Sequence, residues 1–310
     1  MARVTTMSVS PPPPLATRGQ SVRLIPAYFV AELVGTFLLV VIGDGVIASY
    51  IVARKSLDLF AACLAFGVGA MVACFASARI SGAHINPAAS VAFALDGRLK
   101  WRLVPVYLMA QYLGGFLAAL VLYVNYYEAI SALDGGQRSA IGSASSTGAI
   151  FATYPASYVT AWGALLDQVI GTALLLFSLS AVTDKSNHGL PDKHQPLVVA
   201  FVIGMTCVAF SANCGAIFNP ARDLAPRLVT ALFGYPSVWA PLGGTYWLLA
   251  GVVGPHVGAI LGVFAYKFTI GYALDAHRRH LIQQQSEAAL DLEESKRQQR
   301  LVPVTRLGRD

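Results

Sequence analysis

Charged residues are scarce in this sequence: Asp, Glu, Lys and Arg make up only 12% of its 310 residues. A soluble domain carries about 25% of them, so this scarcity excludes an ordinary water-soluble globular protein. Hydrophobic residues instead reach 55%, and the mean hydropathy is +0.58. The composition therefore predicts a protein built for a lipid bilayer.

Several signatures of other functions are also missing from the sequence. The four cysteines lack the spacing of metal ligands, and we find no nucleophile–base pair, no phosphate-binding loop and no Asn-x-Ser/Thr sequon. The amino-terminal tail lacks the apolar core of a signal peptide. Basic residues form no stripe interleaved with aromatic residues. These absences argue against an enzyme, a metal or cofactor site, a nucleic-acid partner and N-glycosylation.

Apolar runs of about 20 residues, the length that a helix needs to cross a bilayer, occur six times. They lie near 26–53, 58–79, 103–126, 162–182, 195–213 and 243–270. So many long helical runs argue against a β-barrel, whose strands give only short alternating segments. Two further apolar segments, 86–97 and 219–233, are long enough for only about half a membrane. We therefore predict an all-α membrane protein with six transmembrane helices.

Both ends of the chain are polar, and an even number of spans places them on the same side of the membrane. We expect residues 1–22 to form a disordered tail, 23–275 the membrane domain, and 276–310 a second, solvated tail, with a short cytoplasmic helix as the alternative there. The chain carries three Lys or Arg residues up to position 23, seven in the second tail and five in the connections on the same side, against three on the opposite side when the two half-membrane segments are set aside. The positive-inside rule therefore predicts that both termini are cytoplasmic.

The two halves of the membrane domain, about 25–135 and 160–272, repeat one pattern. Glu32-Leu-Val-Gly-Thr in the first half corresponds to Gln168-Val-Ile-Gly-Thr in the second. An Asn-Pro-Ala triplet follows in each half, beginning at Asn86 and at Asn219. Each half thus contains three spans, and because three is odd, the halves must be inverted relative to each other. Inverted repeats place their functional site near the midplane of the bilayer.

Each Asn-Pro-Ala triplet predicts the start of a short helix inside the membrane. Asn is a favoured N-cap, and Pro fits the first helical turn. Two such reentrant half-helices, entering from opposite faces, would meet at the centre with Asn86 and Asn219 at the midplane. The non-helical backbone before each triplet cannot face lipid, so it must line a water-filled passage. A turn in a connecting loop would explain one triplet, but not two at matching positions.

These motifs resemble those of the aquaporin (major intrinsic protein) family, and within it the aquaglyceroporin branch. The resemblance spans about residues 25–272 and rests on SGAHINPA at 81–88, NPARDLAPR at 219–227, FATYP at 151–155 and Gln111. It implies a passive channel for glycerol, other small neutral solutes and water that excludes ions and protons. It also implies a homotetramer in a lipid bilayer, with the plasma membrane as the expected location.

The resemblance assigns a narrow constriction to Phe66, Cys207, Ala216 and Arg222. Because Cys207 and Ala216 are both small, they leave room for the carbon backbone of a polyol between Phe66 and Arg222. Asp223 is a further mark of the glycerol-conducting branch, and we expect its carboxylate to stabilise the first turn of the second half-helix. The chain departs from that branch in the last span, where Gly251 stands in place of the usual Pro.

Four further side chains receive expected roles around the passage. Glu32 and Gln168 are each expected to accept hydrogen bonds from the neighbouring reentrant loop, and a neutral Gln168 argues against a coupled proton path. His84 either packs against its loop or acts as a pH gate, since a free histidine titrates near pH 6.5. Cys207 is expected to face the passage, with Cys214 close to it.

Three other functions share parts of this pattern. A water-selective channel would have the same fold with a narrower constriction. A secondary transporter also uses inverted repeats and broken helices, but its uptake would be saturable and coupled to a gradient. A closed scaffold or adhesion protein of the same fold would show no permeability.

Overall fold

The computed structural model describes residues 24–56, 58–187 and 190–301, and these ranges form helices joined by turns and connections, without a strand. Within them, six helical segments are long and apolar enough to cross a membrane. They are α2 (Ile25–Val52), α3 (Leu59–Ser81), α5 (Val104–Asp134), α6 (Ala161–Thr183), α7 (Gln195–Cys214) and a last segment that begins with α9 (Tyr246–Leu248) and α10 (Gly254–Tyr266). The six predicted spans are therefore confirmed, although α5 continues to Asp134, eight residues beyond the expected end.

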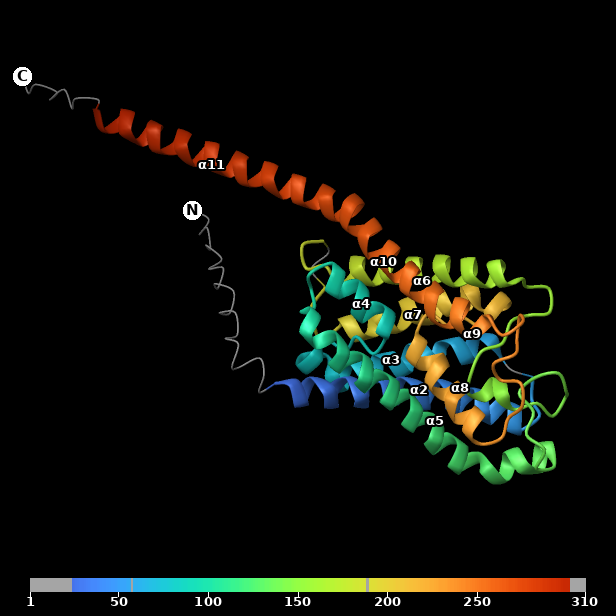
Figure 1. The fold of residues 1–310 in the computed structure, drawn as a ribbon. Helices are drawn as coiled ribbons and strands as arrows, with labels where there is room; N and C mark the ends of the chain where they lie inside the picture. The colour runs from blue at the N-terminus through green and yellow to red at the C-terminus, as the bar shows by residue number, and fades with distance from the viewer. Residues whose placement is uncertain (1–23, 57, 188–189, 302–310) are drawn as a thin grey trace, which may run out of the picture.

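Two shorter helices lie between these spans, and both begin at the Asn-Pro-Ala triplets. α4 covers Pro87–Leu95, and α8 covers Pro220–Leu232. The N-cap asparagine of each helix accepts a hydrogen bond from the backbone two residues on, over 2.9 Å at Asn86 and 3.0 Å at Asn219. Figure 1 shows the two short helices toward opposite ends of the long ones. They are the predicted reentrant half-helices.

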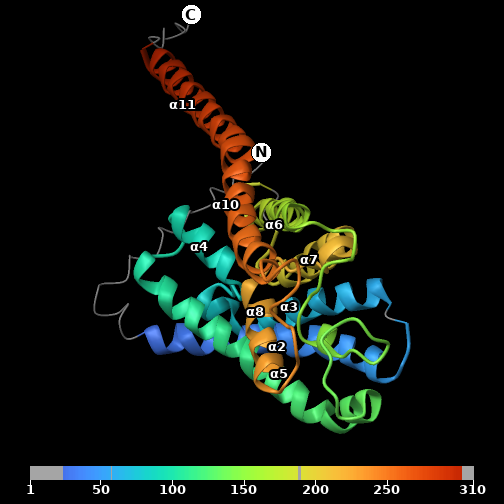
Figure 2. The same ribbon diagram turned by 45° about the vertical axis from the view of Figure 1, so that its right-hand side comes forward.

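The packing of the helices follows the inverted repeat. In the first half α2 packs against α3 and α5, and in the second half α6 packs against α7 and α10 (Figures 1 and 2). The short helices cross over, since α4 packs on α10 and α8 packs on α5. Equivalent glycines permit close contacts: a Cβ atom at Gly114 would collide with the carbonyl of Leu33, and one at Gly258 with that of Val169. Small residues allow membrane helices to approach in this way.

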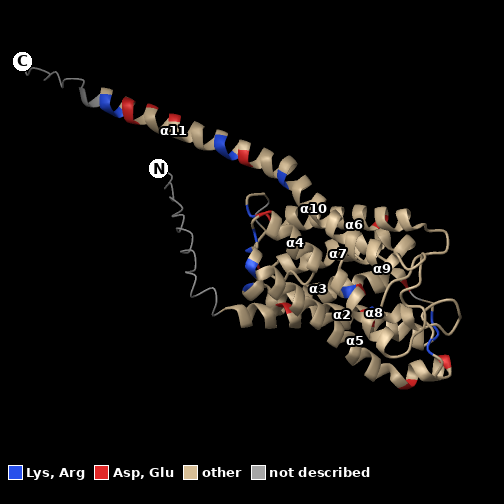
Figure 3. Ribbon diagram, viewed as in Figure 1, with Lys and Arg blue, Asp and Glu red and all other residues tan. Residues whose placement is uncertain are grey.

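The last span departs from regular α-helix at two π-helical turns, Leu249–Val253 and Lys267–Gly271. It then continues without a break into α11 (Tyr272–Leu301), which projects from the bundle with charged residues along its length (Figure 3). We expected a solvated tail here, and the side chains described are indeed exposed, but the backbone is helical. The segment contains no Gly or Pro and is rich in Gln, Glu, Leu and Arg, which favour helix. The disorder expected for residues 1–22 lies outside the described residues.

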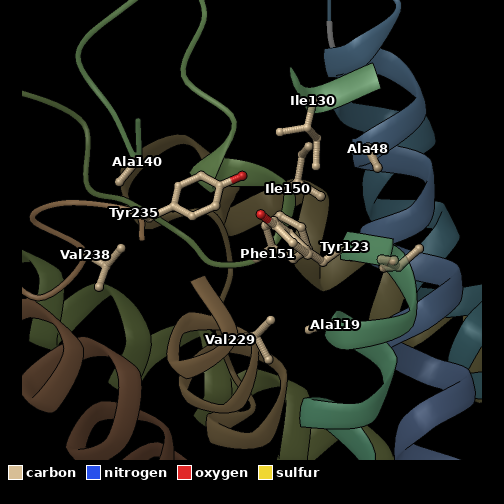
Figure 4. Packing of buried hydrophobic residues seen from close by; sticks show 11 residues of the cluster. Ala48, Ala119, Tyr123, Ile130, Ala140, Ile150, Phe151, Val229, Tyr235 and Val238 are labelled. Carbon is tan, nitrogen blue, oxygen red and sulfur yellow. The ribbon is translucent and has the colours of Figure 1, made fainter. Parts of the chain in front are cut away.

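The connection between the two halves folds over one end of the bundle. Its residues Ala140, Ile150 and Phe151 enter a core with side chains of α2, α5 and α8 (Figure 4). Thr147 and Tyr235 share a hydrogen bond of 2.8 Å between their hydroxyls, which ties this connection to the segment after α8. The connection is thereby held close to the second half-helix.

Candidate functional site

The two loops that lead into the half-helices share an unusual backbone conformation. In each, the residues one and three positions before the asparagine have positive φ angles of 45° to 50°: Ala83, Ile85, Ala216 and Phe218. Such angles are uncommon for residues other than glycine, and the surrounding structure must hold them in place. The strained positions match between the halves, so both loops follow the same path.

The asparagines join these two loops at the centre of the molecule. Asn86 Nδ2 donates a hydrogen bond of 2.9 Å to the carbonyl of Phe218, and Asn219 Nδ2 donates one of 2.7 Å to the carbonyl of Ile85. Each asparagine thus contacts the loop that precedes the other. Each side-chain amide also carries a second N–H that can act as a donor. The structure therefore brings the two triplets together, as the inverted repeat predicts.

Glu32 holds the first loop from α2. Its carboxylate accepts hydrogen bonds from the backbone N–H groups of His84 (2.9 Å) and Ile85 (2.7 Å). Side chains complete its surroundings, since Ser81 donates over 2.6 Å and Gln111 donates over 2.8 Å. This buried carboxylate is fully engaged in holding the backbone of the loop.

Gln168 makes the corresponding contacts in the second half, and a residue that we did not anticipate assists it. Its Oε1 accepts hydrogen bonds from the N–H groups of Ile217 (2.9 Å) and Phe218 (3.2 Å). Its Nε2 donates over 2.7 Å to Asp167, which also accepts a hydrogen bond of 2.8 Å from Asn213. Gln168 occupies the position that corresponds to Glu32. The carboxylate of the second half is therefore Asp167, one residue earlier in the chain.

Two members of the predicted constriction are in direct contact. The guanidinium carbon of Arg222 lies 4.6 Å from the centre of the Phe66 ring, at a distance suited to a cation–π interaction. Cys207 and Ala216 lie together in one buried cluster, whereas Phe66 belongs to another. All four residues keep between 5% and 9% of their surface exposed, so none is sealed completely.

The cysteines are arranged differently from our expectation. Cys214 is fully buried among Ile217, Tyr246 and their neighbours, in a different cluster from Cys207, so its predicted place beside the passage is wrong. Cys63 is instead the cysteine that shares the cluster of Cys207, and its Sγ lies 3.3 Å from Ser211 Oγ. Cys207 and Cys214 are seven residues apart, about two turns of an α-helix, so in a regular helix they would lie on the same side. The kink of α7 at Phe210, between the two cysteines, changes the direction of Cys214.

Asp223 lies in the first turn of α8, as expected, but its contacts reach beyond that turn. Its carboxylate accepts hydrogen bonds of 2.8 Å from both the backbone and the hydroxyl of Thr153, and it pairs with Arg227 at 3.0 Å. Arg227 is fully buried and also donates to the carbonyl of Val238. The pair fixes the connection between the halves to the half-helix. Gly251 lies beside it, with a Cβ position 3.5 Å from the Asp223 carboxylate.

His84 packs between two aromatic rings. Its ring centre lies 4.9 Å from those of both Phe93 and Tyr107, and its Nδ1 lies 3.2 Å from Ser90 Oγ. Arg98 stacks on the Phe93 ring at 4.1 Å, so a positive charge lies just beyond that ring. These surroundings favour the packing role of His84.

Three charged residues received no role in the sequence analysis: Asp44, Asp167 and Arg227, the last residue of the NPARDLAPR motif. Each is an ionisable residue inside an apolar segment, which is itself a signal of function or of a buried partner. Spacing along the chain could have indicated the partners of Asp167 and Arg227, which lie one and four residues away, but not the partner of Asp44.

Comparisons with known proteins agree with the geometry. The family model of the major intrinsic proteins matches residues 20–266. Aquaporin-3 of Milnesium tardigradum is 40% identical over 81% of this chain and 79% of its own length. Human aquaporin-9 is 37% identical over 78% of this chain and 81% of its own.

Among solved structures, the aquaglyceroporin from Plasmodium falciparum superposes with a TM-score of 0.72 at 26% identity, covering 81% of this chain and 99% of that one. The six spans, the paired half-helices and these similarities confirm an integral membrane protein built around a central pore, and not an enzyme. The chain belongs to the major intrinsic protein family, the aquaporins.

Proposed function

We propose that this protein is a passive channel for glycerol, other small neutral solutes and water. The proposal rests on one observation above all: Arg222 lies against the face of the Phe66 ring, and the other two residues of the predicted constriction, Cys207 and Ala216, are small. A polyol presents carbon on one side and hydroxyls on the other. The Phe66 ring suits the carbon side, and the N–H groups of Arg222 suit the hydroxyls.

The midplane supports the same function. The second N–H of each asparagine amide can donate to a passing hydroxyl or water at the point where the half-helices meet. Each half-helix also contributes roughly half a positive charge at its N-terminus, which opposes the entry of a dehydrated cation or hydronium. Glu32 is engaged by the hydrogen bonds of its loop and Gln168 carries no charge, so neither of these two supports serves proton coupling.

We also propose a homotetramer in the plasma membrane with both termini in the cytoplasm. The excess of Lys and Arg on the side of the termini supports this orientation. In Figure 1, α2 begins and α11 emerges at the same end of the bundle, as this orientation requires. Protease accessibility of tags at the two ends, in sealed cells and in permeabilised cells, tests the orientation.

The function is tested by stopped-flow light scattering on proteoliposomes, which compares water and glycerol with protein-free vesicles. We expect both fluxes to rise above the protein-free values, without saturation by glycerol and without a requirement for an ion gradient. A rise in water flux alone would indicate a water-selective channel. Saturable, gradient-coupled uptake would indicate a transporter.

A further inference from the structure

Asp44 is a carboxylate in the middle of the apolar helix α2, and it is completely buried. Neither of its side-chain oxygens accepts a hydrogen bond within the described part of the chain. Burying a carboxylate without donors is costly, and buried polar groups nearly always have partners. The charge at Asp44 therefore needs a compensating group.

Arg222 is that group. Its Nη2 lies 3.6 Å from Asp44 Oδ1, which is an ion pair but too long for a hydrogen bond. The Arg222 side chain makes no hydrogen bond to any residue that the structure describes, and its Nη1 is buried without a partner. Apart from Asp44, the guanidinium contacts the face of the Phe66 ring.

The neighbouring carboxylate cannot serve Arg222 in the same way. Asp223 is occupied by two hydrogen bonds from Thr153 and by its pair with Arg227. The region thus contains two separate pairs, one within α8 and one that joins α2 to α8. Only the second involves a residue of the constriction.

The two partners differ in exposure. Arg222 keeps 5% of its surface exposed, whereas Asp44 has none. Asp44 therefore does not touch a solute in the pore, and any effect on permeation must act through Arg222. Gly43, next to Asp44, also lets the Phe66 ring approach α2, because a Cβ atom there would overlap the ring.

We infer that Asp44 is a positioning residue that sets the selectivity of the constriction by compensating the charge of Arg222 and holding its guanidinium beside Phe66. Its carboxylate makes no hydrogen bond to Arg222, so the guanidinium N–H groups that stay exposed are free to donate to neutral solutes. It also keeps the constriction close to neutral. This inference rests on the proposed function in one respect, namely that Arg222 lines the path of the solute.

The test compares guanidinium with urea, which has nearly the same shape but no charge. Fluxes into proteoliposomes are measured relative to water, with the membrane potential clamped by potassium and valinomycin. In Arg222→Met, the Asp44 charge is unpaired and attracts a cation. We expect its relative guanidinium flux to exceed that of the double variant Asp44→Asn, Arg222→Met by at least tenfold, because a unit charge within several ångströms of the path contributes at least about 1.4 kcal/mol.

Two controls separate this charge effect from others. Urea flux should be equal in Arg222→Met and in the double variant. The second control replaces Glu128, an exposed residue of α5, with Gln, which removes one negative charge away from the constriction. The variant Arg222→Met, Glu128→Gln should therefore keep the high guanidinium flux of Arg222→Met. Equal guanidinium flux with and without Asp44 would overturn the inference. If the unaltered protein conducted no glycerol, the proposed function would be refuted. The comparison of guanidinium flux between Arg222→Met and the double variant would still test the role of Asp44.

Folding of the variants gives a second, independent result. Asp44→Asn leaves the Arg222 charge buried and unpaired, so it should yield less folded protein than the unaltered chain. Adding Arg222→Met should restore the yield, because both members of the pair are then neutral. A double variant that folds no better than Asp44→Asn alone would contradict the pairing.

Discussion

Asp167 and Gln168 are adjacent in the sequence and joined by a hydrogen bond of 2.7 Å from Gln168 Nε2 to Asp167 Oδ2. In the first half of the molecule, Glu32 performs the corresponding task alone and accepts both loop N–H groups with its carboxylate. The second half divides this task between an amide that holds the loop and a carboxylate that orients the amide. The two halves therefore reach the same loop conformation with different charges.

Exchanging the charge between these two residues tests this division. Gln168→Glu would place a second carboxylate against Asp167, and we expect the repulsion and the lost hydrogen bond to lower stability by about 2 kcal/mol. Thermal unfolding of the purified protein in detergent measures this effect. Adding Asp167→Asn should restore most of the stability, because the Asn amide can donate to the new carboxylate. A double variant no more stable than Gln168→Glu would show that Asp167 does not orient residue 168.

The thiols give a second prediction. Mercurials should inhibit permeation by reacting at Cys207 or Cys63, which lie in one cluster beside the constriction. The double variant Cys63→Ser, Cys207→Ser should resist inhibition. Cys214→Ser is the matched control, and it should remain sensitive because Cys214 is fully buried in another cluster. Persistent inhibition of the double variant would place the reactive thiol at Cys74 or Cys214.

The third prediction concerns His84, whose ring is enclosed by Phe93, Tyr107 and Ser90. Charging the ring would be opposed by this enclosure and by the positive charge of Arg98, which stacks on Phe93. We therefore expect glycerol flux to stay constant between about pH 7.5 and 5.5, a range centred near the usual histidine pKa. A response to pH that disappears in His84→Ala would instead establish a gate, and one that persists would direct attention to His194 at the start of α7.

Features with local causes could be predicted from the sequence. The half-helices are an example, because an N-cap asparagine and a proline at the first position act within one turn. The spans follow from the length of the apolar runs. The exposed helix α11 was expected only as the alternative to a solvated tail, since its polar composition suits both a solvated coil and an isolated helix.

Partners distant in the sequence could not be predicted in the same way. Asp223 contacts Thr153, which lies 70 residues earlier, and nothing in the local pattern joins the two. Asp44 is the clearest case: a single carboxylate in an apolar run signals that a partner exists but does not say where. Its pairing with Arg222 depends on how α8 packs against α2.

The central claim is that the small side chains of the constriction admit glycerol, and enlarging them tests it most directly. We would replace Cys207 with His and Ala216 with Val, and measure glycerol and water permeability by stopped-flow light scattering on the same proteoliposomes. The narrower opening should lower glycerol permeability at least tenfold while water permeability falls less than threefold, because one excluded methylene-sized volume corresponds to about 1–3 kcal/mol. Equal losses of both permeabilities would contradict the account.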